Sequence, residues 1–385
     1  MLLHQGQRPL RVIDNRSFIG HVGLVKNNPI PFDLNKLIQD VFAPQPDERV
    51  LVMVDIPHRD LADNPDWQDR RVMAEEWRAA FETFPVVVHP LLSFPATGAG
   101  NADLPAEGRM NNQPVSIAQV MAGSHIVVAM TEFSATAPLA ALARNHKTLR
   151  VASMPGVLRR MEQSALSADY REVARKTYIL NERLTRAETA RITFSTGHVM
   201  DFDLRHRRGH ADDGLCHRGR KFPVINLPSG EAFIVPYEGE RKGEPSRTGG
   251  RIPMIVKGEP FVLSIEANRI VEVLGDGPAA AEMRSFLDTD AARRNVAELG
   301  LGCNDRAVAR GNVLEDEKVG MHWAYGRSEH LGGTVGPDAF QRPEHVVHQD
   351  VVYAPGLEVT VSSIRLTYPA SGEEEIMRDG AYVIL

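Results

Sequence analysis

The sequence predicts an α/β protein in which a doubly wound α/β domain is followed by a mostly β, metal-binding domain. Short β-branched runs alternate with helical patterns in the first half, whereas strands separated by Gly, Asn, Asp and Pro fill the second half. The chain has 385 residues, which is too long for one ordinary hydrophobic core. We therefore expect an α/β domain at 1–190 and a β-rich catalytic domain at 191–385.

The first half is expected to form a parallel sheet covered by helices. Apolar, β-branched runs of four to seven residues indicate buried strands, and the segments between them have the apolar spacing of helices. The expected strands are 49–55, 85–89, 125–130 and 149–152, and the expected helices are 34–42, 66–84, 116–122 and 138–145. Met154-Pro155-Gly156 then interrupts the chain, so one or two linking helices are expected at about 156–189.

The second half has the sequence pattern of an antiparallel β domain, with short apolar runs separated by turn residues. Residues 267–269 join two apolar runs and predict the tip of a hairpin. A helix is expected at 279–294. The expected strands are 191–194, 199–204, 232–235, 252–256, 260–265, 270–274, 357–361, 364–368 and 381–385.

Composition argues against nucleic acids and membranes as partners. The net charge is −6 and the pI is near 6.2, with Lys and Arg spread along the chain rather than gathered on a basic face. The first ten residues lack the apolar core of a signal peptide, and there is no apolar run of about 18 residues. Two cysteines are too few for a disulfide framework. We expect a soluble, cytoplasmic protein.

The run 346–353 carries an imidazole and a carboxylate two residues apart, His348 and Asp350. Alternate side chains of a strand point to the same face, so these two groups can converge on one point. A second strand-like run, 319–326, carries His322. Two His and one Asp on neighbouring strands would form a metal site.

Two glutamates occupy positions that favour a role as ligands. Glu231 directly follows a Pro/Gly turn at the start of a strand, where a tight turn can hold a ligand in a cleft. Glu298 lies inside an apolar run, where an unpaired charge would cost several kcal/mol, so it needs a cation. That cation is either a metal ion or the guanidinium of Arg293 or Arg294.

Together these positions supply three carboxylates and two imidazoles. This mixture is typical of a co-catalytic site for two zinc, cobalt or manganese ions, in which a carboxylate and a water bridge the ions. The candidate metal ligands are Glu231, Glu298, His322, His348 and Asp350.

Four segments resemble the successive metal-binding segments of the aminopeptidase T/aminopeptidase S family of metallopeptidases. They are Asn-Leu-Pro-Ser-Gly-Glu at 226–231, Ala-Glu-Leu-Gly-Leu-Gly at 297–302, the run 315–326 and His-Gln-Asp at 348–350. Residues 134–136 and 150–156 also resemble the N-terminal domain of bacterial members. The resemblance covers about 115–360.

The resemblance implies a cytoplasmic amino-terminal exopeptidase that forms a homodimer and acts on short peptides or small amides. It also implies that the five candidate ligands bind two metal ions. A metal-activated water would attack the substrate, and one free carboxylate must act as the general base. The candidates for that base are Glu231, if it does not itself bind a metal ion, and Glu329.

One position departs from the family pattern. Family peptidases carry a Tyr seven residues after the His of the His-x-Ala-x-Gly segment, and here that position is Glu329, followed by His330. Either Glu329 or His330 faces the site in its place, or Tyr325 substitutes from nearby. Glu329, His330 and Tyr325 are therefore candidate catalytic residues beside Glu231.

Two other functions remain open from the sequence. The same fold serves 2,5-dihydroxypyridine dioxygenases, whose single Fe(II) is held by two His and one Asp, and His322, His348 and Asp350 form that set. A metal-free binding protein would require these residues to be together by accident. Whether Glu231 and Glu298 bind metal separates a dinuclear hydrolase from an iron oxygenase.

Overall fold

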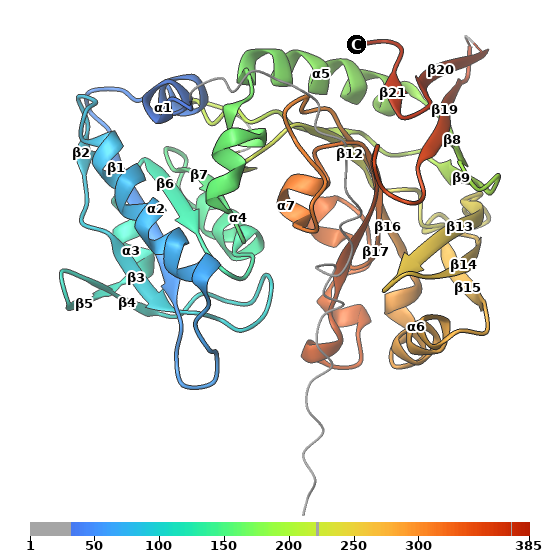
Figure 1. The fold of residues 1–385 in the computed structure, drawn as a ribbon, viewed down its shortest axis with the longest axis horizontal. Helices are drawn as coiled ribbons and strands as arrows, with labels where there is room; N and C mark the ends of the chain where they lie inside the picture. The colour runs from blue at the N-terminus through green and yellow to red at the C-terminus, as the bar shows by residue number, and fades with distance from the viewer. Residues whose placement is uncertain (1–31, 221–222, 371) are drawn as a thin grey trace, which may run out of the picture.

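The computed structural model describes residues 32–385 except 221–222 and 371. One lobe contains the first sheet and its helices, and the second lobe contains the remaining strands (Figure 1). Helix α5 (Tyr170–Arg186) contacts α1 (Leu34–Phe42) in the first lobe and three strands of the second. The α/β class is confirmed.

The first sheet has the order β11-β7-β6-β1-β3-β4-β5, with β2 paired to β1. The strands from β11 to β3 run parallel, and β4 and β5 extend the sheet as antiparallel strands. Their bounds are β1 (Arg49–Ile56), β2 (Val87–Val88), β3 (Leu92–Pro95), β4 (Glu107–Met110), β5 (Gln113–Ser116), β6 (Ile126–Met130), β7 (Arg150–Ser153) and β11 (Val224–Asn226).

Strand β1 shows why this sheet is covered on both faces. Its alternate residues Val50, Val52 and Val54 belong to the apolar core that contains Trp77 of α2 (Pro65–Phe81). Leu51 and Met53 point the other way, into the core formed with α3 (Ile117–Ala122) and α4 (Thr136–Arg144). A strand buried on both faces is typical of a doubly wound sheet.

The linking segment differs from the expected long helices. It contains the 3-10 turns η2 (Arg159–Gln163) and η3 (Ala165–Ser167) before α5 begins. The side chain of Asp169 accepts hydrogen bonds from the backbone N–H groups of Arg171 and Glu172, which fixes the start of α5. Apolar spacing predicted a helical segment, but this cap places the long helix further along the chain.

The second lobe contains two antiparallel sheets. One has the order β10-β12-β16-β17-β18, and the other has the order β15-β14-β13-β9-β8-β19-β20-β21. The first comprises β10 (His210–Asp212), β12 (Glu231–Ile234), β16 (Val296–Gly302), β17 (Met321–Gly326) and β18 (His348–Tyr353). The second comprises β8 (Thr189–Phe194), β9 (Val199–Asp203), β13 (Gly249–Val256), β14 (Glu259–Glu266), β15 (Arg269–Leu274), β19 (Val361–Tyr368), β20 (Gly372–Arg378) and β21 (Ala381–Tyr382).

Helical segments between these strands are short. They are α6 (Pro278–Asp288), η4 (Ala291–Arg294), α7 (Val313–Asp316), η5 (Glu329–Leu331), η6 (Pro337–Ala339) and η7 (Pro343–His345). The expected hairpin tip is confirmed, because Ala267 and Asn268 both have positive φ, at 46° and 65°, between β14 and β15. The expected strand at 357–361 is wrong except for its last residue, Val361, where β19 begins.

Strand β11 connects the two halves of the chain. Although it lies beyond residue 190, it pairs in parallel with β7 at the edge of the first sheet. The segment between β10 and β12 therefore leaves the second lobe and returns to it. The division at 190 does not coincide with the division between sheets, and independent folding of the two parts stays a prediction.

The five-stranded sheet packs one of its faces into an apolar core. Leu299, Leu301, Trp323 and Tyr353 from that face share a core with Phe194 and other residues of the eight-stranded sheet. The opposite face carries charged side chains, as described below. Among the described residues, no helix is long and apolar enough to cross a membrane.

Candidate metal centre

The register of the five-stranded sheet places the five predicted ligands on one face. Glu298 lies opposite Ala324, which lies opposite Asp350 on the next strand. His322 lies opposite Gly300, His348 opposite Gly326, and Glu231 opposite Gly302. Directly paired residues of an antiparallel sheet point to the same side. Residues from β12, β16, β17 and β18 therefore converge although they are far apart in the sequence.

Glu298 lies between the two histidines. Its Oε1 is 3.6 Å from Nε2 of His322, and its Oε2 is 3.1 Å from Nε2 of His348. On the two outer sides, Oε2 of Glu231 is 3.2 Å from Nε2 of His322, and Oδ1 of Asp350 is 3.6 Å from Nε2 of His348. The side chains form a continuous row with a carboxylate at its centre.

This row contains two groups whose ligand atoms lie within 4.8 Å of one another. One group is Glu231, Glu317 and His322, and the other is Glu298, His348 and Asp350. The structure thus brings together all five predicted ligands and adds Glu317, which sequence reasoning did not select.

Glycine makes room for the imidazole of His322. A Cβ atom built on Gly300 would lie 2.0 Å from Nε2 of His322, so no larger residue fits there without moving the ring. Glu231 is also placed by a glycine, because Gly230 has φ of 122°, a conformation that side chains rarely adopt. The Pro/Gly turn before Glu231 therefore sets the start of β12.

Lys318 is a second residue that sequence reasoning missed. Its side chain is fully buried, and its Nζ lies 2.5 Å from Oε1 of Glu231 and 2.7 Å from Oε1 of Glu317. Oδ2 of Asp212 is 3.8 Å from the same nitrogen. The only signal in the sequence was the run Glu315 to Lys318, four charged residues placed just before the apolar strand of His322.

The other two charged residues of that run anchor the backbone rather than face the centre. Glu315 accepts hydrogen bonds from the backbone N–H groups of Ala165 and Val308, and Asp316 from those of Arg310 and Gly311. Burial raises the pKa of Asp316 to about 6. These contacts fix α7 and with it the positions of Glu317 and Lys318.

The close packing of these groups shifts their pKa values strongly. Burial raises the pKa of Asp212 to about 7 and that of Glu317 to about 8. For Glu298 burial acts in the same direction, but hydrogen bonds from His322 and His348 outweigh it and lower the pKa to about 2. The facing carboxylates in turn hold the pKa of both histidines well above the usual value despite burial. Without a metal ion, the negative charge of the carboxylates is therefore compensated by the protonated imidazoles and by the ammonium of Lys318.

The backbone orients one of the two imidazoles. Nδ1 of His348 is 2.7 Å from the carbonyl oxygen of Arg327, which leaves Nε2 facing Glu298. Such a hydrogen bond on the remote nitrogen is the usual way in which a metal-binding histidine is held. Nδ1 of His322 is buried and has no hydrogen-bond partner among the residues that the structure describes.

The three residues considered for the missing tyrosine lie in different places. Tyr325 is on the opposite face of β17, buried in the core beside Trp323 and Phe286, so its expected role in the site does not fit its position. Glu329 is half-exposed and bound to Arg327 at 2.7 Å. Only the His330 ring reaches a candidate ligand, edge to face against His348, with 4.9 Å between the ring centres.

Two simpler interpretations of the sequence do not match the structure. The cation beside Glu298 is neither Arg293, which donates to backbone carbonyl groups, nor Arg294, which pairs with Asp288. The histidine- and arginine-rich segment 205–220 has the composition of a solvated loop. Instead it contains β10, which places Asp212 opposite Glu231.

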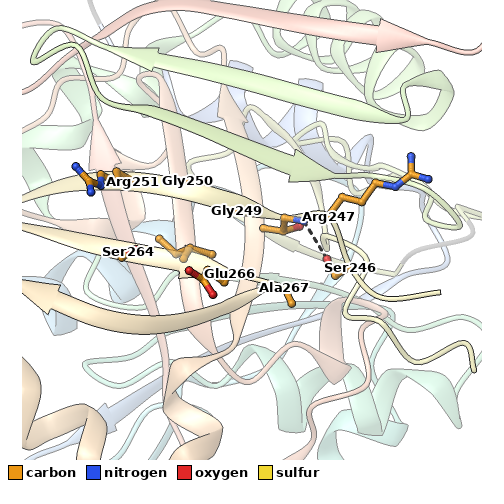
Figure 2. Close-up of a pocket in the computed structure, with 10 residues that line it drawn as sticks. Ser246, Arg247, Gly249, Gly250, Arg251, Ser264, Glu266 and Ala267 are labelled. Carbon is orange, nitrogen blue, oxygen red and sulfur yellow. Dashed lines mark hydrogen bonds between the residues drawn. The ribbon is translucent and has the colours of Figure 1, made fainter. Parts of the chain in front are cut away.

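The described surface also has a hollow along β13 and β14, lined by 246–251 and 264–267 (Figure 2). None of the candidate ligands lines it, and Glu266 is its one carboxylate. Arg247 and Arg251 extend from opposite ends of the view. The hollow therefore lacks the converging groups found on the five-stranded sheet.

Comparison with known families agrees with the geometry of this centre. The profile of the thermophilic metalloproteases (M29) matches residues 133–349, more than half of the chain. The chain belongs to the thermophilic metalloprotease family (M29). The resemblance carried by the four sequence segments is thereby confirmed. A search of curated proteins gave no match.

Two solved structures share the fold. The structure of 2,5-dihydroxypyridine dioxygenase from Pseudomonas putida KT2440 has a TM-score of 0.60 and 15% identity, covering 88% of this chain and 92% of that chain. Wild-type AmpT from Thermus thermophilus has a TM-score of 0.56 and 17% identity, covering 91% of this chain and 99% of that chain. Both fold relatives expected from the sequence are present.

Membership in a metalloprotease family implies a divalent metal, and the residues present fit one. Oε2 of Glu231 is buried and faces Nε2 of His322 at 3.2 Å, so a carboxylate oxygen and an imidazole nitrogen, both of them ligand atoms, are directed toward each other. Five carboxylates, those of Asp212, Glu231, Glu298, Glu317 and Asp350, are gathered around the single ammonium of Lys318, so the positive charge of bound divalent ions would be compensated. The mixture of carboxylate and imidazole suits zinc, cobalt or manganese.

Proposed function

We propose that this metalloprotease-family protein is an aminopeptidase-like hydrolase that removes N-terminal residues from short peptides or cleaves small amides. The observation that carries the proposal is the position of Glu298, with one oxygen toward His322 and the other toward His348. A carboxylate shared between two adjoining ligand groups is the arrangement of a dinuclear hydrolase rather than of a single-metal site.

The proposed ligands are Glu231 and His322 for one ion, His348 and Asp350 for the other, and Glu298 for both. Glu317 lies within reach of the first group. When bound, two divalent ions would polarise the scissile carbonyl and lower the pKa of a shared water toward about 7. The protein's own contribution is to hold these side chains on rigid strands, with backbone support at His348.

The general base must be a carboxylate near the attacking water. Of the two candidates, Glu231 lies in the centre, whereas Glu329 is bound to Arg327 outside it. A Glu231 that binds the ion has no oxygen free for the proton, so we propose Glu231 as the base only for a centre in which it is not a metal ligand. We propose that His330, whose ring lies against that of His348, donates a hydrogen bond to the oxyanion that develops on the substrate.

The remaining parts of the proposal concern the setting of the enzyme. Both cysteines, Cys216 and Cys303, are buried and free, which fits a reducing compartment, and we propose a cytoplasmic enzyme. A homodimer is proposed from the resemblance to aminopeptidases T and S. The substrate is a short peptide or another small molecule.

A dioxygenase is the second candidate function, because a dioxygenase shares the fold. The dioxygenase from Pseudomonas putida shares the fold at a TM-score of 0.60, and His322, His348 and Asp350 supply the two imidazoles and one carboxylate that suit a single non-haem iron. In that case the chain would be a ring-cleaving dioxygenase of the 2,5-dihydroxypyridine type, and Glu231 and Glu298 would only orient the ligands.

Metal analysis and two activity assays separate these functions. The full-length protein is purified without chelators and its metal content is measured, after which aminoacyl amides and 2,5-dihydroxypyridine are offered as substrates. The hydrolase proposal expects two divalent ions per chain and release of the N-terminal residue. One iron per chain, oxygen uptake with the pyridine and no amide cleavage would establish the alternative instead.

A further inference from the structure

The buried lysine beside the candidate ligands carries an inference of its own. Lys318 is fully buried, and charged residues are rarely so unless they are paired. Its ammonium contacts Glu231 and Glu317 at hydrogen-bond distance and has Asp212 as a third, more distant neighbour. A lysine in this position cannot be a surface counter-ion, because all three carboxylates are enclosed with it.

The contacts of Lys318 select one oxygen from each neighbouring glutamate. Its Nζ binds Oε1 of Glu231 and Oε1 of Glu317. The other oxygen of Glu231, Oε2, is buried and lies 3.2 Å from Nε2 of His322. Each glutamate is thus left with one oxygen that no ammonium holds, and both glutamates belong to the ligand group of His322.

The backbone holds Lys318 firmly in this place. Its N–H donates to the carbonyl oxygen of Glu315, and its own carbonyl accepts from the N–H of Asn304, each at 3.0 Å. A Cβ atom on Gly302 would lie 2.8 Å from the Cα atom of Lys318, so strand β16 packs directly against it. The backbone of Lys318 is consequently fixed, and its ammonium is held by Glu231 and Glu317.

We propose that Lys318 is a positioning residue of the metal centre, which holds Glu231 and Glu317 so that each offers a single oxygen to the ion bound at His322. The inference rests on the proposed dinuclear site and adds a residue to it. Without the ammonium the two glutamates would repel each other, and their free oxygens would no longer converge on His322. The contacts of Lys318 are with Asp212, Glu231 and Glu317, so an ion that Glu298, His348 and Asp350 would hold should stay.

The test compares Lys318→Met, which removes all donors, with Lys318→Gln, whose amide keeps two donors without a charge. Lys257→Met is the matched control, since Lys257 pairs with Glu282 at the exposed surface. Each full-length protein is loaded with zinc and dialysed, its ions per chain are counted, and its folding is checked by circular dichroism. Cobalt-loaded samples report the coordination geometry through their visible spectra.

Lys318→Met is expected to fall from two bound ions to one, with loss of one component of the cobalt spectrum. Lys318→Gln should keep the second ion but release it more readily, and Lys257→Met should keep both. A folded Lys318→Met protein with two ions and an unchanged cobalt spectrum would overturn the proposal. If the wild type itself holds no second ion, the dinuclear function fails, which is a separate result from a failure of the Lys318 assignment.

A crystal structure of the zinc-loaded wild type gives the same test without any substitution. The proposal requires Nζ of Lys318 to stay within hydrogen-bond distance of both glutamates, with one oxygen of each on the ion. Chelation of that ion by both oxygens of either glutamate, or a lysine turned away from them, would contradict it. This measurement remains decisive if the substituted proteins do not fold.

Discussion

At the scale of single residues, the centre depends on charged groups. Burying any one of them without its partners would destabilise the folded state. Glu231, Glu298 and His322 are all buried, and each is compensated by the others, by His348 or by Lys318. Removing one member of such a set leaves its partners as uncompensated charges in a region of low dielectric. Substitutions here should therefore change metal content and activity together.

His348→Ala or Asp350→Ala should remove most of the bound metal and nearly all activity, because both side chains belong to one ligand group. The fold should persist, since their strand keeps its ladder with β17. His345→Ala is the control, as His345 binds Asp290 at 3.0 Å rather than the centre. Metal counts and circular dichroism check this, and full metal content in both variants would remove them from the site.

Glu298→Gln should lower the metal content by about one ion per chain, because an amide is a poor ligand for a divalent cation. The shared position of Glu298 makes it the residue that best separates two ions from one. In the iron-oxygenase alternative the same variant would keep its single ion. Metal counting on both proteins, prepared side by side, decides between them.

His330→Ala should lower turnover more than it raises the Michaelis constant, because the lost contact forms mainly in the transition state. The expected loss is on the order of 10²-fold, as for other oxyanion donors. Glu329→Gln serves as the control and should behave like the wild type, since Glu329 is half-exposed and bound to Arg327. Equal kinetics in all three proteins would place this turn outside the active site.

At the scale of elements, the centre is a property of four strands in register. Strand periodicity predicted that His348 and Asp350 share a face, and β18 has that form. Glu317 and Lys318 could not be selected in the same way, because they follow the short helix α7, where no periodicity determines which side chain faces inward. Asp212 was missed because the Arg and His around it resemble a solvated loop, whereas pairing of β10 with β12 decides its position.

The same register explains the small residues between the ligands. Gly300→Ala should displace the imidazole of His322, because the added Cβ would lie 2.0 Å from Nε2. We expect metal affinity to fall about 10- to 100-fold, the range seen when the support of a ligand is removed. Gly123→Ala is a fair control, since its Cβ would come no nearer than 3.5 Å to any neighbour. Unchanged zinc affinity in Gly300→Ala would mean that His322 does not bind the metal from this position.

At the scale of the whole molecule, the alternation of strand and helix predicted the first sheet, and the spacing of turn residues predicted the β-rich lobe. The sequence pattern did not predict that β11 returns to β7, because a three-residue strand has no periodicity and its partner lies about 70 residues away in the chain. This crossing ties the lobes together through the segment that leads directly into Glu231. Because of this connection, metal binding in the second lobe could also change the stability of the first sheet.

Metal binding should slow hydrogen exchange in the second lobe and leave exchange in the first lobe largely unchanged. The reason is that the ligands all lie on β12, β16, β17, β18 and the turn after α7. Proteins open locally, one cooperative unit at a time. A ligand that binds only the native state stabilises those units whose opening would release it. Hydrogen exchange of the protein with and without zinc measures this directly. Slower exchange is expected in 296–302, 321–326 and 348–353, with little change in 49–56 and 126–130. Equal protection of both sets would show that the chain opens as one cooperative unit, coupled through β11 and α5, and would contradict a division of the fold into separate domains.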